Sequence, residues 1–203
     1  MSERISSKVI HRLTLYHSIL RDCTLRGAEF VSSHQMAELL DIDDSQVRKD
    51  INLCEVSGKT KIGYSVPELK RAIEKLLGFE RNKDVFIIGA GNLGLALAKY
   101  DDFKDYGLNV LALFDVDSQK VDKIISSRRV FHSSRLKELT KKMGVEIAIL
   151  TVPASEAQKV AQELVDAKIK YIWNFTPTVL DIPKNIKVRN ENFMGAFLDF
   201  TRS

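Results

Sequence analysis

Hydrophobic positions in the first 80 residues recur at the spacing of helices. Steps of three or four residues predict one apolar face of a first helix, made of Val9, Leu13, Tyr16 and Leu20. Ser32-Ser33 can cap a second, short helix, whose inward side chains would be Met36, Leu39 and Leu40. A capping box at 65–68 then opens another helix that stops at Gly78. This part of the chain is therefore predicted to be helical.

A polar turn, Asp41–Asp44, joins the short helix to a further helix predicted over residues 45–56. Its buried side would hold Val47, Ile51 and Cys54. Its outer side would present Ser45, Lys49 and Asn52, with Gln46 and Arg48 on the flanks. Two short helices joined by a tight turn, with a basic outer face on the second, are typical of a helix-turn-helix that binds DNA.

The next segment, Ser57–Tyr64, is punctuated by glycine and carries Lys59 and Lys61. A winged helix places a β-hairpin here, and the lysines of that hairpin contact DNA phosphates. The periodicity fits an ordinary solvated surface equally well. Both interpretations of the four basic residues, Arg48, Lys49, Lys59 and Lys61, therefore stay open at this point.

Beyond residue 80 the pattern changes to short apolar runs that alternate with helices. Four runs are predicted to be buried strands, at 84–88, 109–114, 145–152 and 170–173. A helix is predicted at 155–167, between the last two of them. This alternation predicts an α/β fold, with a parallel sheet covered by helices on both faces.

The motif Gly89-Ala90-Gly91-Asn92-Leu93-Gly94 follows the first of these strands and opens a helix toward Tyr100. In G-x-G-x-x-G the first glycine permits a tight turn, the second lets a pyrophosphate approach the backbone, and the third lets helix and strand pack closely. Asp115 ends the second strand, 21 residues after Gly94. A carboxylate there accepts hydrogen bonds from an adenosine ribose and repels a ribose phosphate, which favours NAD(H) over NADP(H). The alternative is a purely structural glycine turn.

Two other segments lie at the carboxyl ends of strands, where α/β sheets bind their ligands. Thr151-Val152-Pro153 and Asn174-Phe175-Thr176-Pro177 are predicted to form the floor of a nicotinamide site, or only to terminate strands. Tyr100 and Lys104 spell the Y-x-x-x-K of short-chain dehydrogenases, but they lie too close behind the glycine loop, and His132 falls in a polar loop. Because no base with an orienting partner is recognisable, we expect binding without turnover.

Composition narrows the class of protein further. A chain with 44% hydrophobic and 29% charged residues is an ordinary globular protein, and it has no apolar run of signal-peptide or membrane-helix type. Cys23 and Cys54 lie far apart without a His/Cys cluster, which favours a reducing cytoplasm and no metal site. The net charge of +4 hints at nucleic acid, but residues 1–80 carry as many acidic as basic side chains.

The last residues carry an apolar stripe of helical spacing, made of Phe193, Phe197 and Phe200 with Met194 and Leu198 beside them. We expect three parts: a winged helix-turn-helix domain at 1–80, a Rossmann-like dinucleotide domain at 81–190, and a terminal helix at 191–203. The terminal helix needs a surface to cover. Exchange between the subunits of a twofold dimer and packing on its own domain are both compatible with the pattern.

In order and spacing, these motifs resemble the Rex family of redox-sensing transcriptional repressors over essentially the whole chain. The resemblance is carried by residues 46–50, 58–64, 89–94, 114–117, 151–153 and 174–177. It implies a homodimer with a swapped terminal helix, whose winged helices bind a palindromic operator in the NAD⁺ or apo state and release it with NADH. The alternative function is an NAD(H)-dependent oxidoreductase, or a CoA-type module, with an appended helical domain. Asp115 argues against CoA, whose ribose carries a phosphate.

The resemblance also places Tyr100 and Phe193 near the nicotinamide and Arg12 near the contact between the domains. Two departures from the family pattern stand out. The family's wing is close to G-x-R-G-V-G-Y, whereas here Thr60 and Lys61 replace the arginine and the second glycine. Asn192 stands where the family often has an acid, which removes a charge that can distinguish cationic NAD⁺ from neutral NADH.

Overall fold

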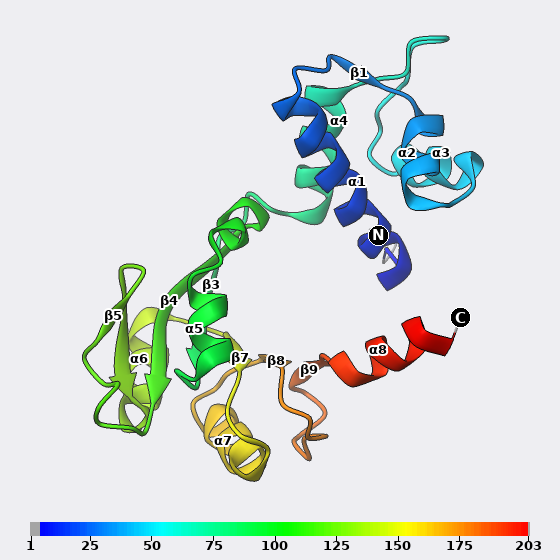
Figure 1. Cartoon of the computed structure of the whole chain (residues 1–203). Coiled ribbons are helices and arrows are strands. Elements are labelled where there is room, and N and C mark those ends of the chain that lie inside the picture. Colours follow the sequence, from blue (N-terminus) through cyan, green and yellow to red (C-terminus); the bar gives the residue numbers. More distant parts are fainter. Residues whose placement is uncertain (1–4, 203) are drawn as a thin grey trace. The chain divides into compact units, whose positions relative to one another are not determined.

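Four helices and a two-stranded sheet make up the amino-terminal part of the described chain, as the helical periodicity predicts. They are α1 (Ser7–Leu25), β1 (Phe30–Val31), α2 (Ser33–Leu40), α3 (Asp44–Asn52), β2 (Tyr64–Ser65) and α4 (Val66–Leu77). The structure is a computed structural model that describes residues 5–202. Between Arg81 and Asn82 the chain divides into two compact units (Figure 1).

The predicted apolar stripe of α1 forms the core of the first unit. Leu13, Tyr16 and Leu20 are fully buried, and they belong to one cluster with residues of α3 and α4. Ser32 caps α2 in a reciprocal capping box with Gln35. Ser65 is the N-cap of α4, but its side chain makes no capping hydrogen bond, so the capping box predicted at 65–68 is not formed.

Two details of the helix-turn-helix differ from the prediction. Leu39 is 69% exposed, because at about 100° per residue it lies well away from the direction shared by the buried Met36 and Ala37. Helix α3 begins at Asp44 and ends at Asn52, four residues earlier than predicted. Its end tightens into short turns, and Glu55 adopts a left-handed φ of 57°, which leads the chain away from the helix axis.

The second unit alternates strands and helices as predicted, with more elements than the apolar runs reveal. They are β3 (Lys83–Ile88), α5 (Asn92–Ala98), the 3-10 helix η1 (Asp101–Tyr106), β4 (Leu108–Asp115), β5 (Ile124–Ile125), β6 (Arg128–His132), the 3-10 helix η2 (Ser133–Arg135), α6 (Leu136–Met143), β7 (Ile147–Leu150), α7 (Ala154–Asp166), β8 (Tyr171–Asn174), β9 (Lys187–Asn190) and α8 (Phe193–Arg202).

The sheet of this unit has the order β5-β6-β4-β3-β7-β8-β9, and all neighbours are parallel except β5 and β6. If the hairpin strand β5 is left out and the other six strands are renumbered in chain order, their order across the sheet is 3-2-1-4-5-6. This is the strand order of dinucleotide-binding folds. The chain reverses its direction of sheet growth between β3 and β7. Ligands of such sheets bind at that reversal, beyond the carboxyl ends of the strands.

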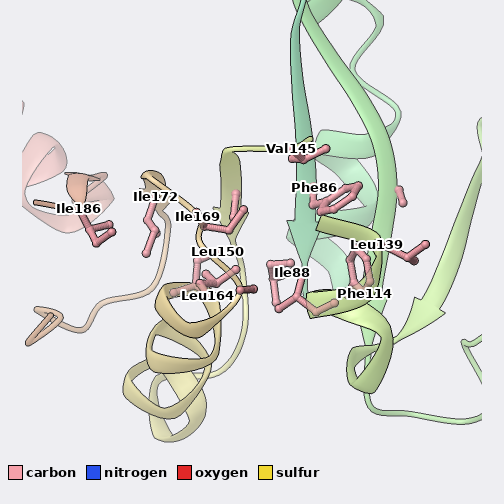
Figure 2. Packing of buried hydrophobic residues seen from close by; sticks show 14 residues of the cluster. Phe86, Ile88, Phe114, Leu139, Val145, Leu150, Leu164, Ile169, Ile172 and Ile186 are labelled. Atoms are coloured by element: carbon pink, nitrogen blue, oxygen red, sulfur yellow. The ribbon is translucent and has the colours of Figure 1, made fainter. Parts of the chain in front are cut away.

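Successive side chains of β3 enter two separate cores on opposite faces of the sheet. Phe86 and Ile88 join the cluster that α6 and α7 cover, whereas Val85 and Ile87 join the cluster on the α5 side. Figure 2 shows the first cluster, in which the rings of Phe86 and Phe114 meet at 4.9 Å. Helices therefore cover both faces, as the alternating pattern predicts.

Arg128 is buried although it is charged, with only 8% of its surface exposed. Its guanidinium donates to three backbone carbonyl oxygens, those of Val110 at 3.0 Å, Ala98 at 2.6 Å and Ser126 at 3.0 Å. Ala98 is the last residue of α5, so Arg128 ties the end of this helix to the edge of the sheet.

No helix among residues 5–202 is both long enough and apolar enough to cross a lipid bilayer.

Replacing Arg128 with methionine should lower the free energy of unfolding by about 2–4 kcal/mol, because buried carbonyl oxygens lose their charged donor. Arg129→Met is the matched control. The Arg129 side chain is 55% exposed in its ion pair with Asp122, and an exposed pair contributes little to stability. Urea unfolding of both variants measures the difference. Equal losses in the two variants would contradict the role given to Arg128.

Candidate functional site

The glycine loop, residues 89–94, joins β3 to α5 at the carboxyl edge of the sheet. Gly89 has a φ of 103°, in the left-handed region that favours glycine. Gly94 packs so closely that a Cβ atom there would overlap the carbonyl oxygen of Gly89. At Gly91, by contrast, a Cβ atom would meet nothing within 4 Å. The geometry thus agrees with the three roles expected of the motif: a turn, an open approach to the backbone, and a close helix–strand contact.

Helix α5 begins at this loop without a capping side chain. Its first intrahelical hydrogen bond runs from the Leu95 amide to the Gly91 carbonyl, at 2.9 Å. The amides of Asn92 and Leu93 precede that bond and have no acceptor within the helix, as at every helix start. They are oriented to bind an anion, and the positive end of the helix dipole adds to the attraction.

Asp115 lies beside this loop, with only 10% of its side chain exposed. Its carboxylate accepts hydrogen bonds from the amides of Ala90 at 2.8 Å and Asp117 at 2.9 Å. Burial alone would raise the pKa of Asp115, but these two amides and the charge of Lys120 together lower it below its usual range. The carboxylate is therefore ionised at neutral pH and keeps lone-pair positions for a ligand hydroxyl.

Lys120 is a site residue that the sequence reasoning missed. Its ammonium nitrogen lies 3.3 Å from Asp115 Oδ2 and 3.8 Å from Asp117 Oδ2. A basic residue five positions after the strand-ending acid was the available signal. Because Lys120 offsets part of the negative charge, the site repels a ribose phosphate less strongly than a lone carboxylate would.

A cavity of about 370 Å³ opens next to Asp115, at the carboxyl ends of β3, β4 and β7. Six predicted cofactor residues line it: Gly89, Gly91, Asp115, Thr151, Val152 and Pro153. Leu136 and Val160, from α6 and α7, add apolar walls that the sequence reasoning did not identify. The volume and the mixture of apolar walls with few polar groups are typical of a site for a small organic ligand.

Thr151 and Asn174 shape the site from the neighbouring strands. The Thr151 hydroxyl lies 3.0 Å from Ile88 O and 2.9 Å from Gly89 O, where it braces the start of the glycine loop. Asn174 is fully buried, and its amide nitrogen donates to Thr178 O and to Asn190 Oδ1, both at 2.9 Å. These contacts make Asn174 an organiser of the loop after β8, and its contact with a cofactor stays a prediction.

Tyr100 and Phe193 lie outside the cavity, at the two ends of an aromatic row. Its ring centroids follow one another at 5.0 Å (Tyr100–Phe103), 6.1 Å (Phe103–Trp173), 4.9 Å (Trp173–Phe175) and 5.9 Å (Phe175–Phe193). The row runs along the face of the sheet that α5 covers. Tyr100 and Phe193 are half exposed or more, at 50% and 60%. The structure therefore joins both predicted nicotinamide residues through one apolar surface.

In the first unit, three of the predicted DNA-binding residues surround one depression of about 440 Å³. Arg48 lines it from α3, and Lys59 and Lys61 line it from the wing. Ser32 and Ser33, at the start of α2, complete it. Ser45, Gln46 and Lys49 lie on α3 outside this lining, and Ser45 and Lys49 are exposed. Three cations and the amino-terminal end of a helix suit a phosphate group.

The wing differs from the hairpin predicted at 57–64. Within that segment only a bridge between Lys59 and Gly63 forms, whereas β2 pairs with β1, which precedes the helix-turn-helix. Lys61 stands at the tip with a φ of 65°. A side chain in this left-handed conformation costs about 1–2 kcal/mol, which explains why glycine suits this position in the family's wing.

Among the residues that the structure describes, neither Cys54 nor a metal cluster provides a second candidate centre. Burial, together with the charge of Asp50, raises the pKa of the Cys54 thiol to about 11. At neutral pH the thiol is protonated, which makes it a poor nucleophile. Among residues 5–202 no group of three or more metal-ligating side chains comes together.

Two family models match the chain. One, described as "Putative DNA-binding protein N-terminus", matches residues 4–52, and the other, "CoA binding domain", matches residues 80–178. The redox-sensing transcriptional repressor Rex of Treponema denticola is 40% identical over 93% of this chain and 90% of its own length. The chain belongs to the Rex family. The Rex of Clostridioides difficile is 36% identical over 94% of this chain and 91% of its own length.

Solved Rex structures resemble this chain along nearly its whole length. RSP, a Rex-family repressor, in complex with β-NAD⁺ and operator DNA gives a TM-score of 0.86 at 32% identity, covering 97% of this chain and 91% of that chain. RSP in complex with β-NADH also gives 0.86, covering 98% and 94%. The predicted family and the predicted fold of a DNA-binding domain followed by a parallel sheet are confirmed. The Rex relatives named here are repressors, as expected, rather than enzymes.

The glycine loop gives a matched pair of substitutions. Gly91→Ala should leave the melting temperature unchanged, since a Cβ atom fits there, but weaken NADH binding at least about tenfold, because the methyl group stands where the pyrophosphate approaches. Gly94→Ala should instead destabilise the second unit by several kcal/mol. Calorimetric titration and thermal melting measure both effects. Wild-type NADH affinity in Gly91→Ala would contradict this assignment of the loop.

Proposed function

We propose that this protein is a DNA-binding transcriptional repressor that senses the cellular NADH/NAD⁺ balance. It binds operator DNA in the NAD⁺ or apo state and is released by NADH. One observation carries the proposal: a chain of the Rex family retains both a basic depression on its helix-turn-helix and a glycine loop with a strand-ending acid. RSP, a repressor of the same family, has been crystallised in one complex with β-NAD⁺ and operator DNA and in another complex with β-NADH.

The residues of the second unit fit NAD(H). The open space at Gly91 and the uncapped amides of α5 suit a pyrophosphate, and ionised Asp115 suits the adenosine ribose. The cavity beside Asp115 is the expected seat of the adenosine. NAD(H) supplies the redox signal, because its nicotinamide ring is cationic when oxidised and neutral when reduced. We assign Tyr100 and Phe193 to the surroundings of that ring.

We infer binding of the dinucleotide without turnover. The two alternatives to a repressor are an oxidoreductase and a CoA-type ligand-binding module. The CoA-type module agrees with the name of the family model that matches residues 80–178. The Rex relatives that match over nine tenths of the chain favour the repressor. Ionised Asp115 and the neighbouring Asp117 at the cavity disfavour CoA, because the single ammonium of Lys120 offsets their negative charge only in part and a ribose phosphate is still repelled.

The partner that we propose for the terminal helix is a second copy of the chain. Five apolar residues of α8 are each more than half exposed, namely Phe193, Met194, Phe197, Leu198 and Phe200. An exposed apolar face of this kind is typical of a protein–protein interface, here that of a homodimer. The twofold symmetry of such a dimer matches that of a palindromic operator. We place this repressor in the cytoplasm, with its DNA. Exchange of α8 between subunits and packing of α8 on its own subunit both remain compatible with this dimer.

The proposed mechanism is a thermodynamic linkage between the two sites. NADH must bind the arrangement that cannot hold DNA more tightly than the arrangement that can. Couplings of this type amount to about 1–3 kcal/mol, or five- to 150-fold in affinity. By reciprocity, operator DNA must weaken NADH binding by the same factor.

Fluorescence anisotropy at fixed salt tests this linkage, on a palindromic duplex selected from a random library. NADH should weaken operator binding about five- to 150-fold and NAD⁺ should not, with two chains bound per duplex. Asp115→Ala should lose the NADH response, whereas Lys49→Ala should bind DNA more weakly at unchanged NADH affinity. Equal NADH affinity with and without operator would refute the linkage.

Asn192 offers a test of how the two dinucleotides are distinguished. Its carbonyl oxygen accepts from Ala196 N at 3.0 Å and its Oδ1 accepts from Gly195 N at 2.9 Å, so Asn192 is the N-cap of α8. Asn192→Asp keeps the cap and adds a charge, and it should raise the affinity for NAD⁺ relative to NADH severalfold. Asn192→Ser keeps a cap without a charge and should not. Competition titrations with NAD⁺ and NADH measure the affinity ratio in both variants. An unchanged ratio in Asn192→Asp would rule out a role of the charge at position 192 in distinguishing the two dinucleotides.

A further inference from the structure

Asp50 is a buried carboxylate in the last turn of α3, the second helix of the helix-turn-helix, with 2% of its side chain exposed. It accepts four hydrogen bonds from three side chains. Arg12 donates two, at 2.6 Å and 2.8 Å, Tyr16 donates one at 2.9 Å, and Gln46 donates one at 3.0 Å. Arg12 and Tyr16 belong to α1. The carboxylate therefore fixes the rotation of α3 against α1.

The ionisation of Asp50 decides which way the amide of Gln46 points. Burial would raise the pKa of Asp50, but the hydrogen bonds from Arg12 and Tyr16 lower it below its usual range. An ionised carboxylate only accepts hydrogen bonds, so the nitrogen of the Gln46 amide must face it. Oε1 and the remaining N–H of Gln46 are then left for an outside partner. An oxygen and an N–H side by side match N6 and N7 of adenine in the major groove.

The other polar residues of α3 suit the DNA backbone better than the bases. Arg48 is paired with Asp44 and lines the depression with the wing lysines, a setting for phosphate. Lys49 is exposed and carries a compact charge on a flexible stem. Of the predicted contact residues, Gln46 is the one with an amide side chain. The buried Asp50 of the same helix holds this amide, and Gln46 is still partly exposed.

We propose that Gln46 reads an adenine in each operator half-site and that Asp50 is the positioning residue that fixes its amide for this contact. The proposal deepens the proposed function and rests on it, since the first unit must bind DNA. Gln46 supplies the base contact, and Asp50 acts only through Gln46. Arg12 and Tyr16 hold Asp50 in turn.

The test begins with wild-type protein and a duplex selected from a random library. Each base pair of one half-site is replaced in turn, and anisotropy gives the affinity. We expect one A·T pair whose replacement weakens wild-type binding about five- to 150-fold, the range of one bidentate base contact. Replacing that adenine with 7-deazaadenine, which lacks the N7 acceptor, should weaken binding at the same position. In Gln46→Ala the discrimination at this pair should vanish while discrimination at the other pairs stays.

Asp50→Asn tests the positioning role. An amide at position 50 pairs with either end of the Gln46 amide, so discrimination at the same pair should fall. In the double variant with Gln46→Ala, Asp50→Asn should cause no further loss there, as a double-mutant cycle requires of coupled residues. Tyr16→Phe removes one of the four bonds without a change of charge. Tyr16→Phe should lower discrimination at that pair about two- to threefold. This variant therefore tests the positioning role even if Asp50→Asn does not fold.

Lys49→Ala is the control for a backbone contact. It should weaken every duplex alike and lower the salt slope by about one. If wild-type protein selects no duplex, the proposed function itself fails. If it selects a duplex but Gln46→Ala keeps discrimination at every pair, the base-reading role is overturned. If Asp50→Asn weakens all duplexes equally, Asp50 serves the fold alone and the positioning role is overturned.

Discussion

The close approach of α5 to β3 at the glycine loop is the constraint on which the second unit depends. At Gly94 the helix lies against the Gly89 carbonyl and the Thr151 hydroxyl, so two strands and a helix meet where no side chain fits. Thr151 bridges from β7 to the end of β3, across the point where the strand order reverses. The uncapped start of α5, Asp115 and the cavity all lie directly beside this contact.

Features of the fold and of the site were predictable from sequence where residues close together in the chain determine them, and not where distant residues do. Strand β3 alternates between two buried faces, and the glycine motif directly follows it, so both were recognisable. Strand β1 has two residues, Phe30–Val31, and pairs with a segment more than 30 positions away, so it left no pattern. The burial of Arg128 has no signal in the sequence, because the sequence does not show the carbonyls that surround its guanidinium. Lys120 follows Asp115 by five residues, but only the structure shows that its ammonium group folds back onto that carboxylate.

Net charge proved a poor guide to the DNA-binding unit because its acids have specific tasks. Asp43 caps α3 through the Ser45 amide, at 2.6 Å. Asp44 pairs with Arg48, and Asp50 lies inside the unit against Arg12. Each of these carboxylates is bound to a neighbouring residue and organises the helix that carries the cations. A unit with as many acids as bases can therefore still present a basic surface.

The position of Trp173, the single tryptophan, has a spectroscopic consequence. Its indole lies in the middle of the aromatic row, and its Nε1 donates to Glu191 Oε1 at 2.8 Å, just before the cap of α8. Indole emission responds to hydrogen bonding and to nearby rings. When tryptophan is excited selectively, the emission thus comes from one known place, between the last strand of the sheet and the terminal helix. Rearrangement of that helix is therefore observable without any label.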